Sequence, residues 1–189
     1  MKIYLASQSK QRRDLLRRDR VRVTVVRAPY VERFRAGETP ARAAMRLALG
    51  KALAARVPAR AGDSLVIGAD TLIAFEGKIL GKPKSERHAY RMLKSFSGKP
   101  QWVYTGVALV RRPGGAKRVF YDRSKVVFKK MSDADIRQYL ATGEYKDKAG
   151  AFGLQGKGAH LIRSTSGSAS NIIGFPLEKF RRERKRFSR

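Results

Sequence analysis

The sequence predicts an α/β protein whose mixed central sheet is flanked by helices. Short apolar, β-branched runs alternate along the chain with segments of helical periodicity. The run SLVIGAD at 64–70 is almost continuously apolar, as is typical of a strand buried on both faces. The segment after Ser85 shows the complementary pattern, because a serine is a favourable N-cap and the apolar residues that follow share one helix face. These residues are Ala89, Met92, Leu93 and Phe96.

The remaining elements follow from the same two patterns, taken in chain order. Strands are expected at 3–5, 21–26, 64–70, 72–75, 78–80, 101–110 and 118–129. Helices are expected after the caps Ser9, Thr39, Ser85 and Ser132, and a last one from Pro176. The helix after Thr39 is expected to reach about residue 57 and to bury the face formed by Met45, Leu49, Ala52 and Leu53. No repeat or linker is evident, which favours a single domain over residues 1–189.

Composition excludes several kinds of site. The 189 residues include no cysteine, so neither a disulfide framework nor a thiolate metal site is possible. The two histidines, His88 and His160, are too few for a histidine-rich zinc centre. The N-terminal apolar run is too short for a signal peptide, and no stretch approaches the roughly eighteen apolar residues of a membrane span. A cytoplasmic protein without membrane contact is therefore expected.

The charge of the chain is extreme for a compact domain. Its 43 lysines and arginines against 15 aspartates and glutamates leave a formal net charge of +28. A nucleic-acid partner would gain affinity from counterion release. However, the basic residues occur on nearly every expected helix, and the one dense run is a C-terminal tail at 181–189. This distribution favours weak, non-specific nucleic-acid binding, and a dedicated nucleic-acid function stays open as an alternative.

Polar side chains that could carry chemistry occur in three places. Asp70 directly follows an apolar run, where α/β proteins commonly place ligands, and its carboxylate could hold Mg²⁺ or orient a water molecule. Lys82 stands in LGKP, between a glycine and a proline. The glycine-rich segment 147–158, which contains Gln155, could bring main-chain amides close to an anion. Each of these also has an ordinary structural interpretation, as a cap, a buried acid or a polar turn.

The order of the motifs along the chain is more specific than any one of them. The chain contains, in this order, LASQS (5–9), VER (31–33), GADT (68–71), LGKP (80–83), SFSGKP (95–100), TGVAL (105–109), DKAGAFGLQGKG (147–158) and SNIIGFPLE (170–178). In this order and at this length the sequence resembles the Maf family of nucleotide pyrophosphatases, over essentially the whole chain. The resemblance implies a fold similar to the inosine triphosphatase group, with two lobes around a cleft, and a homodimer. It also implies hydrolysis of nucleoside triphosphates to the monophosphate and pyrophosphate, with Mg²⁺ or a similar divalent ion such as Mn²⁺.

The resemblance also implies roles for residues at matching positions. Asp70, Glu32 and Lys82 would be catalytic: the two acids would serve the metal ion and the attacking water, with Asp70 as the general base. The residues implied to contact or neutralise the triphosphate are Ser7, Arg12, Lys51 and Lys82. Thr71 and Gln155 match the branch of the family that prefers dTTP, UTP and related pyrimidine nucleotides.

Two departures from the family pattern bear on activity. A proline and an arginine usually precede Arg12, where this chain has Lys10 and Gln11. The acid that commonly precedes Glu32 is replaced by Val31. A catalytically impaired relative, which keeps the fold and binds nucleotide without turnover, therefore stays open as a second alternative.

Overall fold

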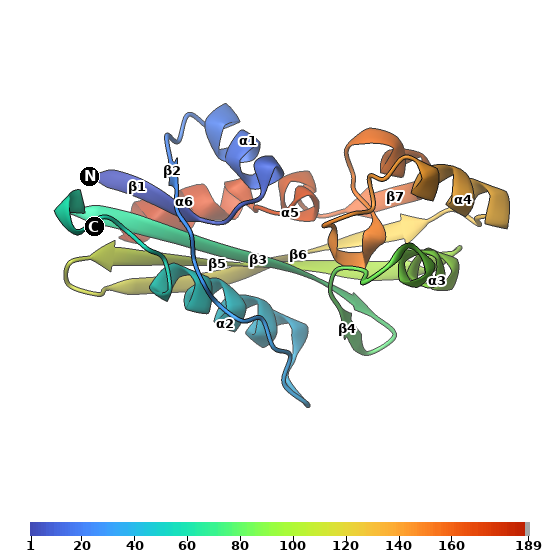
Figure 1. Ribbon diagram of the computed structural model, residues 1–189, viewed down its shortest axis with the longest axis horizontal. Helices are drawn as coiled ribbons and strands as arrows, with labels where there is room; N and C mark the ends of the chain where they lie inside the picture. Colours follow the sequence, from blue (N-terminus) through green and yellow to red (C-terminus); the bar gives the residue numbers. More distant parts are fainter. Residues whose placement is uncertain (188–189) are drawn as a thin grey trace. The chain divides into compact units, whose positions relative to one another are not determined.

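The computed structural model describes residues 1–187, and within this range seven strands form one mixed sheet (Figure 1). The strands are β1 (Lys2–Ala6), β2 (Thr24–Val25), β3 (Ser64–Phe75), β4 (Lys78–Leu80), β5 (Pro100–Arg112), β6 (Lys117–Phe128) and β7 (Ile162–Ser166). The sheet order is β2-β1-β3-β5-β6-β7, and β4 pairs with β3. Strand β1 is parallel to β2 and β3, whereas β4 is antiparallel to β3 and β7 is antiparallel to β6. The predicted α/β architecture with a mixed sheet is confirmed.

The helices begin largely where the sequence predicts them. They are α1 (Lys10–Arg18), α2 (Pro40–Leu53), α3 (Glu86–Phe96), α4 (Asp133–Ala141), α5 (Ala169–Ile173) and α6 (Leu177–Phe187), with 3₁₀ turns at Ala59–Ala61, Ala149–Ala151 and Gly156–Leu161. The four predicted caps each accept a hydrogen bond from a backbone N–H in the first turn: Ser9, Thr39, Ser85 and Ser132. None of the helices in residues 1–187 has both the length and the apolar character that a membrane crossing requires.

The chain divides into two compact units, and strands β3, β5 and β6 contribute residues to both. The first unit comprises Met1–Asp70, Thr105–Asp122 and the chain from Gly174 onward. The second unit comprises Thr71–Tyr104 and Arg123–Ile173. The sequence analysis treated residues 1–189 as one domain, within which the family resemblance implies two lobes.

Two glycines allow helix α2 to approach the sheet of the first unit closely. A Cβ atom on Gly68 of β3 would lie 2.1 Å from the carbonyl oxygen of Ala48. A Cβ atom on Gly106 of β5 would lie 2.2 Å from the carbonyl oxygen of Ala44. Because backbone meets backbone here, the helix turns its small residues toward the sheet. The buried residues of α2 are Ala43, Ala44, Leu47, Ala48 and Ala52.

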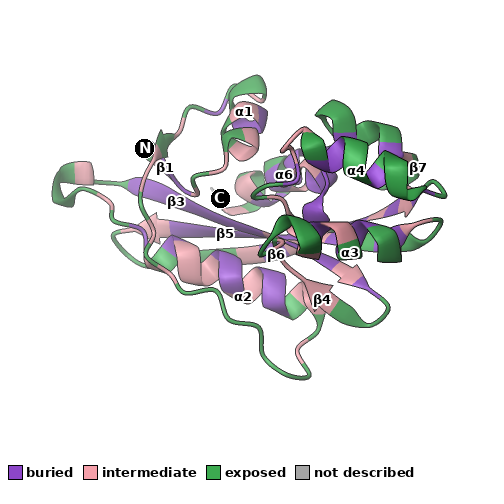
Figure 2. Cartoon of the chain, turned by 45° about the vertical axis from the view of Figure 1, so that its right-hand side comes forward, coloured by how far each residue is buried: buried purple, intermediate pink, exposed green. Residues whose placement is uncertain are grey.

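The predicted buried face of α2 was therefore wrong. Of its four members only Ala52 is fully buried, Met45 and Leu49 are half-buried, and Leu53 is 46% exposed. Figure 2 shows buried and intermediate positions alternating along α2. The hydrophobic pattern favoured the larger side chains, whereas the close approach to the sheet selects the smaller ones. The helix also ends at Leu53 rather than near residue 57.

Other boundaries differ because pairing with a distant strand defines them. The strand expected at 21–26 is reduced to Thr24–Val25, which pairs with β1 at Tyr4 and Leu5. The strands expected at 64–70 and 72–75 form the single strand β3. Neither β7 nor the short helix α5 was predicted. The polar sequence of β7 has no strand pattern of its own, and it is extended because it pairs with β6.

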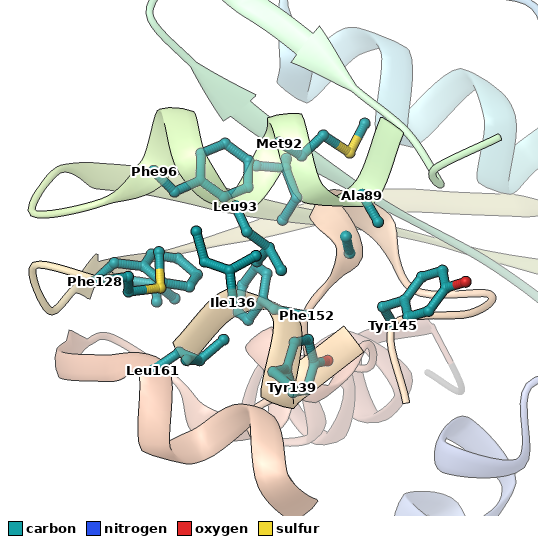
Figure 3. Close-up of a cluster of buried hydrophobic side chains, with 14 of the residues drawn as sticks. Ala89, Met92, Leu93, Phe96, Phe128, Ile136, Tyr139, Tyr145, Phe152 and Leu161 are labelled. Carbon is teal, nitrogen blue, oxygen red and sulfur yellow. The ribbon is translucent and has the colours of Figure 1, made fainter. Parts of the chain in front are cut away.

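The second unit is built around an aromatic core (Figure 3). The rings of Phe75 and Phe96 lie edge to face with centroids 4.9 Å apart, and those of Phe128 and Phe152 have the same arrangement at 5.1 Å. Such pairs contribute roughly 0.5–1.5 kcal/mol each beyond the burial of their area. The predicted buried face of α3 is confirmed, since Ala89, Met92, Leu93 and Phe96 all belong to this core.

The predicted basic tail is the continuation of helix α6. Leu177, Phe180 and Glu183 are buried, and Phe187 is half-buried beneath the guanidinium of Arg111. Residues 188 and 189 of the predicted tail lie outside the described residues. The basic side chains at 181–186 therefore belong to the last helix, which the sequence predicts from Pro176 and which is part of the first unit.

Candidate active site

Asp70 lies where the parallel pairing between β1 and β3 ends. The last paired residues are Ala6 and Gly68, so Asp70 lies just beyond the carboxyl end of β1, a common ligand position in α/β sheets. Strand β3 itself continues to Phe75, and the prediction that Asp70 ends its strand was wrong. The residue is buried, with 4% of its surface exposed.

Lys51, in the last turn of α2, joins two carboxylates. Its Nζ lies 2.5 Å from Oδ1 of Asp70 and 2.6 Å from Oε1 of Glu32. The side chains of Lys51 and Asp70 are largely buried, whereas that of Glu32 is 49% exposed. Helix α2, strand β3 and the segment between β2 and α2 thus bring three of the predicted site residues together.

The carboxylate of Asp70 is only partly satisfied by this contact. Burial raises the pKa of Asp70, and the nearby positive charges of Lys51 and Arg12 oppose that rise. Lys51 contacts Oδ1, while Oδ2 is buried and has no hydrogen-bond partner among residues 1–187. An unpaired buried oxygen costs free energy, so its presence calls for an explanation. An oxygen in this state can accept a proton or bind a ligand.

Arg12 and Ser7 contribute a second part of the site from the start of α1 and the loop before it. Nη1 of Arg12 donates to Oγ of Ser7 at 3.0 Å, and Nε donates to the carbonyl oxygen of Gly174 at 2.8 Å. Burial lowers the pKa of Arg12, and the negative charges of Asp70 and Glu32 act in the opposite direction. The first unit therefore holds five predicted site residues in one group: Ser7, Arg12, Glu32, Lys51 and Asp70.

The first turn of α1 favours anions. Helix α1 begins at Lys10, a position at which the resemblance leads one to expect a proline. Ser9 caps this helix, since its hydroxyl oxygen accepts a hydrogen bond from the backbone N–H of Arg12. The first turn contains no acidic residue. The partial positive charge of the helix N-terminus therefore adds to that of the Arg12 guanidinium. Gln11, half-buried in the same turn, contributes no charge.

Thr71 and Lys82 belong to the second unit. Thr71 follows Asp70 along β3 and is half-buried. Nζ of Lys82 lies 3.4 Å from Oδ1 of Asp147, and both side chains are exposed. An exposed pair of this kind contributes little to stability, so the ammonium of Lys82 can exchange this partner for another anion.

The glycine-rich segment of the second unit is held at two points. The N–H of Gly150 donates to the carbonyl oxygen of Gly81 at 3.0 Å. The N–H of Lys157 donates to Oε2 of Glu144 at 2.9 Å. Gln155 lies between these two points and is exposed. The backbone that carries Gln155 is thus fixed, while its amide side chain faces solvent.

Arg46 and Glu38 lie near the site but were not predicted to belong to it. Two nitrogens of the Arg46 guanidinium bind the carboxylate of Glu38, and one of them also donates to the carbonyl oxygen of Arg33. The signal that could have located this pair is the acid directly before the cap Thr39, from which a side chain can reach the second turn of the helix.

The group of residues in the first unit suits a hard divalent cation. In the described part of the chain no three His, Cys, Asp or Glu side chains gather, so the protein would supply the carboxylates of Asp70 and Glu32. Mg²⁺ accepts such a donor set, because it keeps several waters and takes further ligands from phosphate oxygens. The unpaired Oδ2 of Asp70 and the half-exposed carboxylate of Glu32 fit this use.

Comparisons with known proteins agree on one family. A model of Maf-like proteins matches residues 2–187. A dTTP/UTP pyrophosphatase of Carboxydothermus hydrogenoformans is 40% identical over 183 residues, which cover 97% of both chains. A dTTP/UTP pyrophosphatase of Moorella thermoacetica is 44% identical over 176 residues, covering 93% of this chain and 90% of the relative. A third protein of that name, from Clostridioides difficile, is 41% identical over 179 residues, covering 95% of this chain and 91% of the relative.

Proposed function

The chain belongs to the Maf-like protein family, and on this premise we propose that it hydrolyses dTTP and UTP to the nucleoside monophosphate and pyrophosphate. The observation that carries the proposal is the group around Asp70, in which a partly unsatisfied carboxylate lies among cations in the first unit. Relatives that bear the name dTTP/UTP pyrophosphatase match this chain over nearly its full length.

In this proposal Asp70 is the general base. Its carboxylate accepts a proton from a water molecule as the water oxygen forms a bond to the α-phosphorus. The bond between the α- and β-phosphates breaks, and pyrophosphate leaves. The raised pKa of Asp70 supports the assignment, because a carboxylate that binds its proton more strongly is a better base near neutral pH.

Cationic and hydroxyl groups of the first unit bind the triphosphate. Arg12 offers guanidinium N–H groups that match phosphate oxygens, and Ser7 is held beside it. Lys51 is paired with two carboxylates. When the triphosphate binds, the ammonium of Lys51 also contacts the phosphate oxygens. Its ion pairs with Asp70 and Glu32 then weaken. The carboxylate of Asp70 is then free to accept a proton from water, and both carboxylates would be able to hold a divalent cation.

The remaining functional groups bind the metal ion, the triphosphate and the base of the nucleotide. Glu32 and Asp70 would hold Mg²⁺ or Mn²⁺, and the bound ion would neutralise charge on the phosphoryl oxygens. Lys82 adds a positive charge for the triphosphate. Thr71 and Gln155 select the pyrimidine nucleotide, as their match to the pyrimidine-preferring branch implies. The active form is a homodimer, which is the assembly expected for the family.

A nucleotide panel with pyrophosphate detection tests the proposed function. We expect pyrophosphate release from dTTP and UTP to exceed that from ATP and GTP, and to require Mg²⁺ or Mn²⁺. Equal rates for all nucleotides, or a preference for a methylated guanosine triphosphate, would overturn the substrate assignment. Binding of dTTP without turnover would favour the catalytically impaired alternative, for which Lys10, Gln11 and Val31 are the sequence evidence.

The positive charge favours a second, weaker interaction. With a net charge of +28, the protein gains affinity for any polyanion from counterion release. Basic side chains lie on every helix of the first unit and are not confined to α6. We therefore propose nucleic-acid binding that is weak and independent of base sequence, as a property of the surface rather than a separate function.

A further inference from the structure

The segment that carries Glu32 has no helix or strand of its own. It runs from residue 26 to residue 39, between β2 and α2, and contains only a short turn. The side chain of Glu32 is half-exposed, so burial alone does not fix it. Restricting such a segment to one conformation costs conformational entropy at every residue. Contacts elsewhere in the segment must therefore hold Glu32 against Lys51.

Arg46 provides one of these contacts. Its Nε donates to Oε1 of Glu38 at 2.8 Å, and its Nη2 lies 2.5 Å from Oε2 of the same carboxylate. The same Nη2 also donates to the carbonyl oxygen of Arg33 at 2.9 Å. Arg33 directly follows Glu32, so the backbone beside the functional carboxylate is tied to α2. The planar guanidinium makes these bonds in a single geometry, which an ammonium does not reproduce.

Tyr30 provides a contact on the other side of Glu32. Its ring covers Gly50, where a Cβ atom would lie 2.2 Å from Cζ of the tyrosine. Its hydroxyl oxygen accepts a hydrogen bond from the guanidinium of Arg46. Gly50 directly precedes Lys51 on α2. The segment is therefore held two residues before Glu32 by Tyr30 and one residue after it by Arg46.

We propose that Arg46, supported by Tyr30, is the positioning residue that holds Glu32 within reach of Lys51 and of the metal ion. One helix then carries both the guanidinium that fixes the segment and the ammonium that pairs with its carboxylate. The proposal rests on the proposed function, since it concerns the same metal ion and the same reaction. Arg46 itself touches neither substrate nor metal, and it acts through Glu32.

Substitution of Arg46 tests the proposal, with Arg42 as the matched control. Arg42 lies one turn earlier on α2 and is exposed. Arg46→Met should raise the Mn²⁺ concentration needed for half-maximal turnover by about 10- to 100-fold, the range for residues that orient metal ligands. Arg46→Lys should restore only part of the loss, and Arg42→Met should behave as the wild type. In a Glu32→Gln background Arg46→Met should have little further effect, because the two residues act as a unit.

Two measurements without nucleotide separate this proposal from the proposed function. Hydrogen exchange of the amides at 30–38 should be faster in Arg46→Met than in Arg42→Met, and titration with Mn²⁺ alone should show weaker binding. If the wild type hydrolyses no nucleotide, the proposed function fails, and these two measurements still decide the role of Arg46. Unchanged exchange and unchanged Mn²⁺ binding in Arg46→Met, or losses that multiply with those of Glu32→Gln, would overturn the positioning role.

Discussion

Nζ of Lys51 lies 2.5 Å from Oδ1 of Asp70, while the second oxygen of that carboxylate is buried without a hydrogen-bond partner in the described part of the chain. The pair is therefore asymmetric, because only Oδ1 of the carboxylate contacts the ammonium of Lys51. Most buried polar atoms in folded proteins are hydrogen-bonded, so a buried oxygen in this state is a candidate for contact with water or a ligand. The asymmetry leaves Asp70 able to receive a proton or a metal ion without first breaking a contact at Oδ2.

The first prediction concerns the stability of Asp70→Asn in metal-free buffer. Burial raises the pKa of Asp70, so the folded protein holds this proton more tightly than the unfolded chain does. The ionised carboxylate therefore destabilises the protein above the folded pKa, and the effect fades as the pH falls through that pKa. Asp70→Asn should melt at a higher temperature than the wild type at neutral pH, with a difference that shrinks on acidification. A lower melting temperature at neutral pH would show that the ion pair with Lys51 outweighs desolvation.

Local signals in the sequence predicted the parts of the fold that depend on near neighbours. The caps at Ser9, Thr39, Ser85 and Ser132 could be located because each side chain bonds a backbone N–H within the next turn. Strand β7 could not be located, since its polar residues are extended only through pairing with β6. The buried face of α2 likewise depends on Gly68 and Gly106, which come from strands distant in the sequence.

The candidate site shows the same division. The motifs identified Ser7, Arg12, Glu32, Lys51 and Asp70, and the structure brings these five together in the first unit. Their motifs did not indicate how Glu32 reaches Lys51. In the proposal above that contact depends on Arg46 and Glu38, whose side chains meet where α2 lies beside the segment 26–39. A hydrophobic pattern carries no signal for such a pair.

The second prediction concerns Gln11, which stands where the family usually has an arginine. Gln11→Arg adds a guanidinium to the first turn of α1, beside Arg12 and near the positive end of the helix. It should lower KM for dTTP or raise kcat. The corresponding gain in free energy should not exceed that of one charge-assisted hydrogen bond, roughly 1.5–3 kcal/mol. Steady-state kinetics measure the change. Gln11→Lys is the control for charge without the guanidinium geometry, and unchanged kinetics in both variants would show that Lys10 or Arg13 already supplies this charge.

The third prediction concerns nucleic-acid binding. If the charge acts through its overall distribution, neutralising two exposed cations should weaken binding to the same extent on any helix. Arg182→Gln with Lys185→Gln on α6 should therefore match Arg87→Gln with Arg91→Gln on α3, all four residues being exposed. Affinity for a duplex of arbitrary sequence, measured by fluorescence anisotropy, should fall steeply between about 50 and 200 mM salt. A loss confined to the α6 variant would instead identify a dedicated interface on that helix.

The fourth prediction separates the two acids of the site, beginning with Glu32. Glu32→Gln removes one charge from a half-exposed side chain whose proposed task is to hold the metal ion. Turnover should fall, and a higher Mg²⁺ concentration should partly restore it, because the remaining ligands still bind the ion. A loss that no metal concentration relieves would give Glu32 a role in proton transfer instead.

Asp70→Asn completes the comparison and tests the mechanism most directly. The amide keeps the size of the side chain and can still accept a hydrogen bond from Lys51, but it loses the charge and the basicity. The variant should fold, as its circular dichroism and melting curve will show, and it should still bind dTTP. Turnover should fall by about 10²-fold or more, and added Mg²⁺ should not restore it, because general-base catalysis cannot be replaced by occupancy of the metal site. Near-normal turnover in the folded variant would remove Asp70 as the base and make Glu32 the first alternative, since Lys51 holds that carboxylate within 2.6 Å on the other side of the same ammonium.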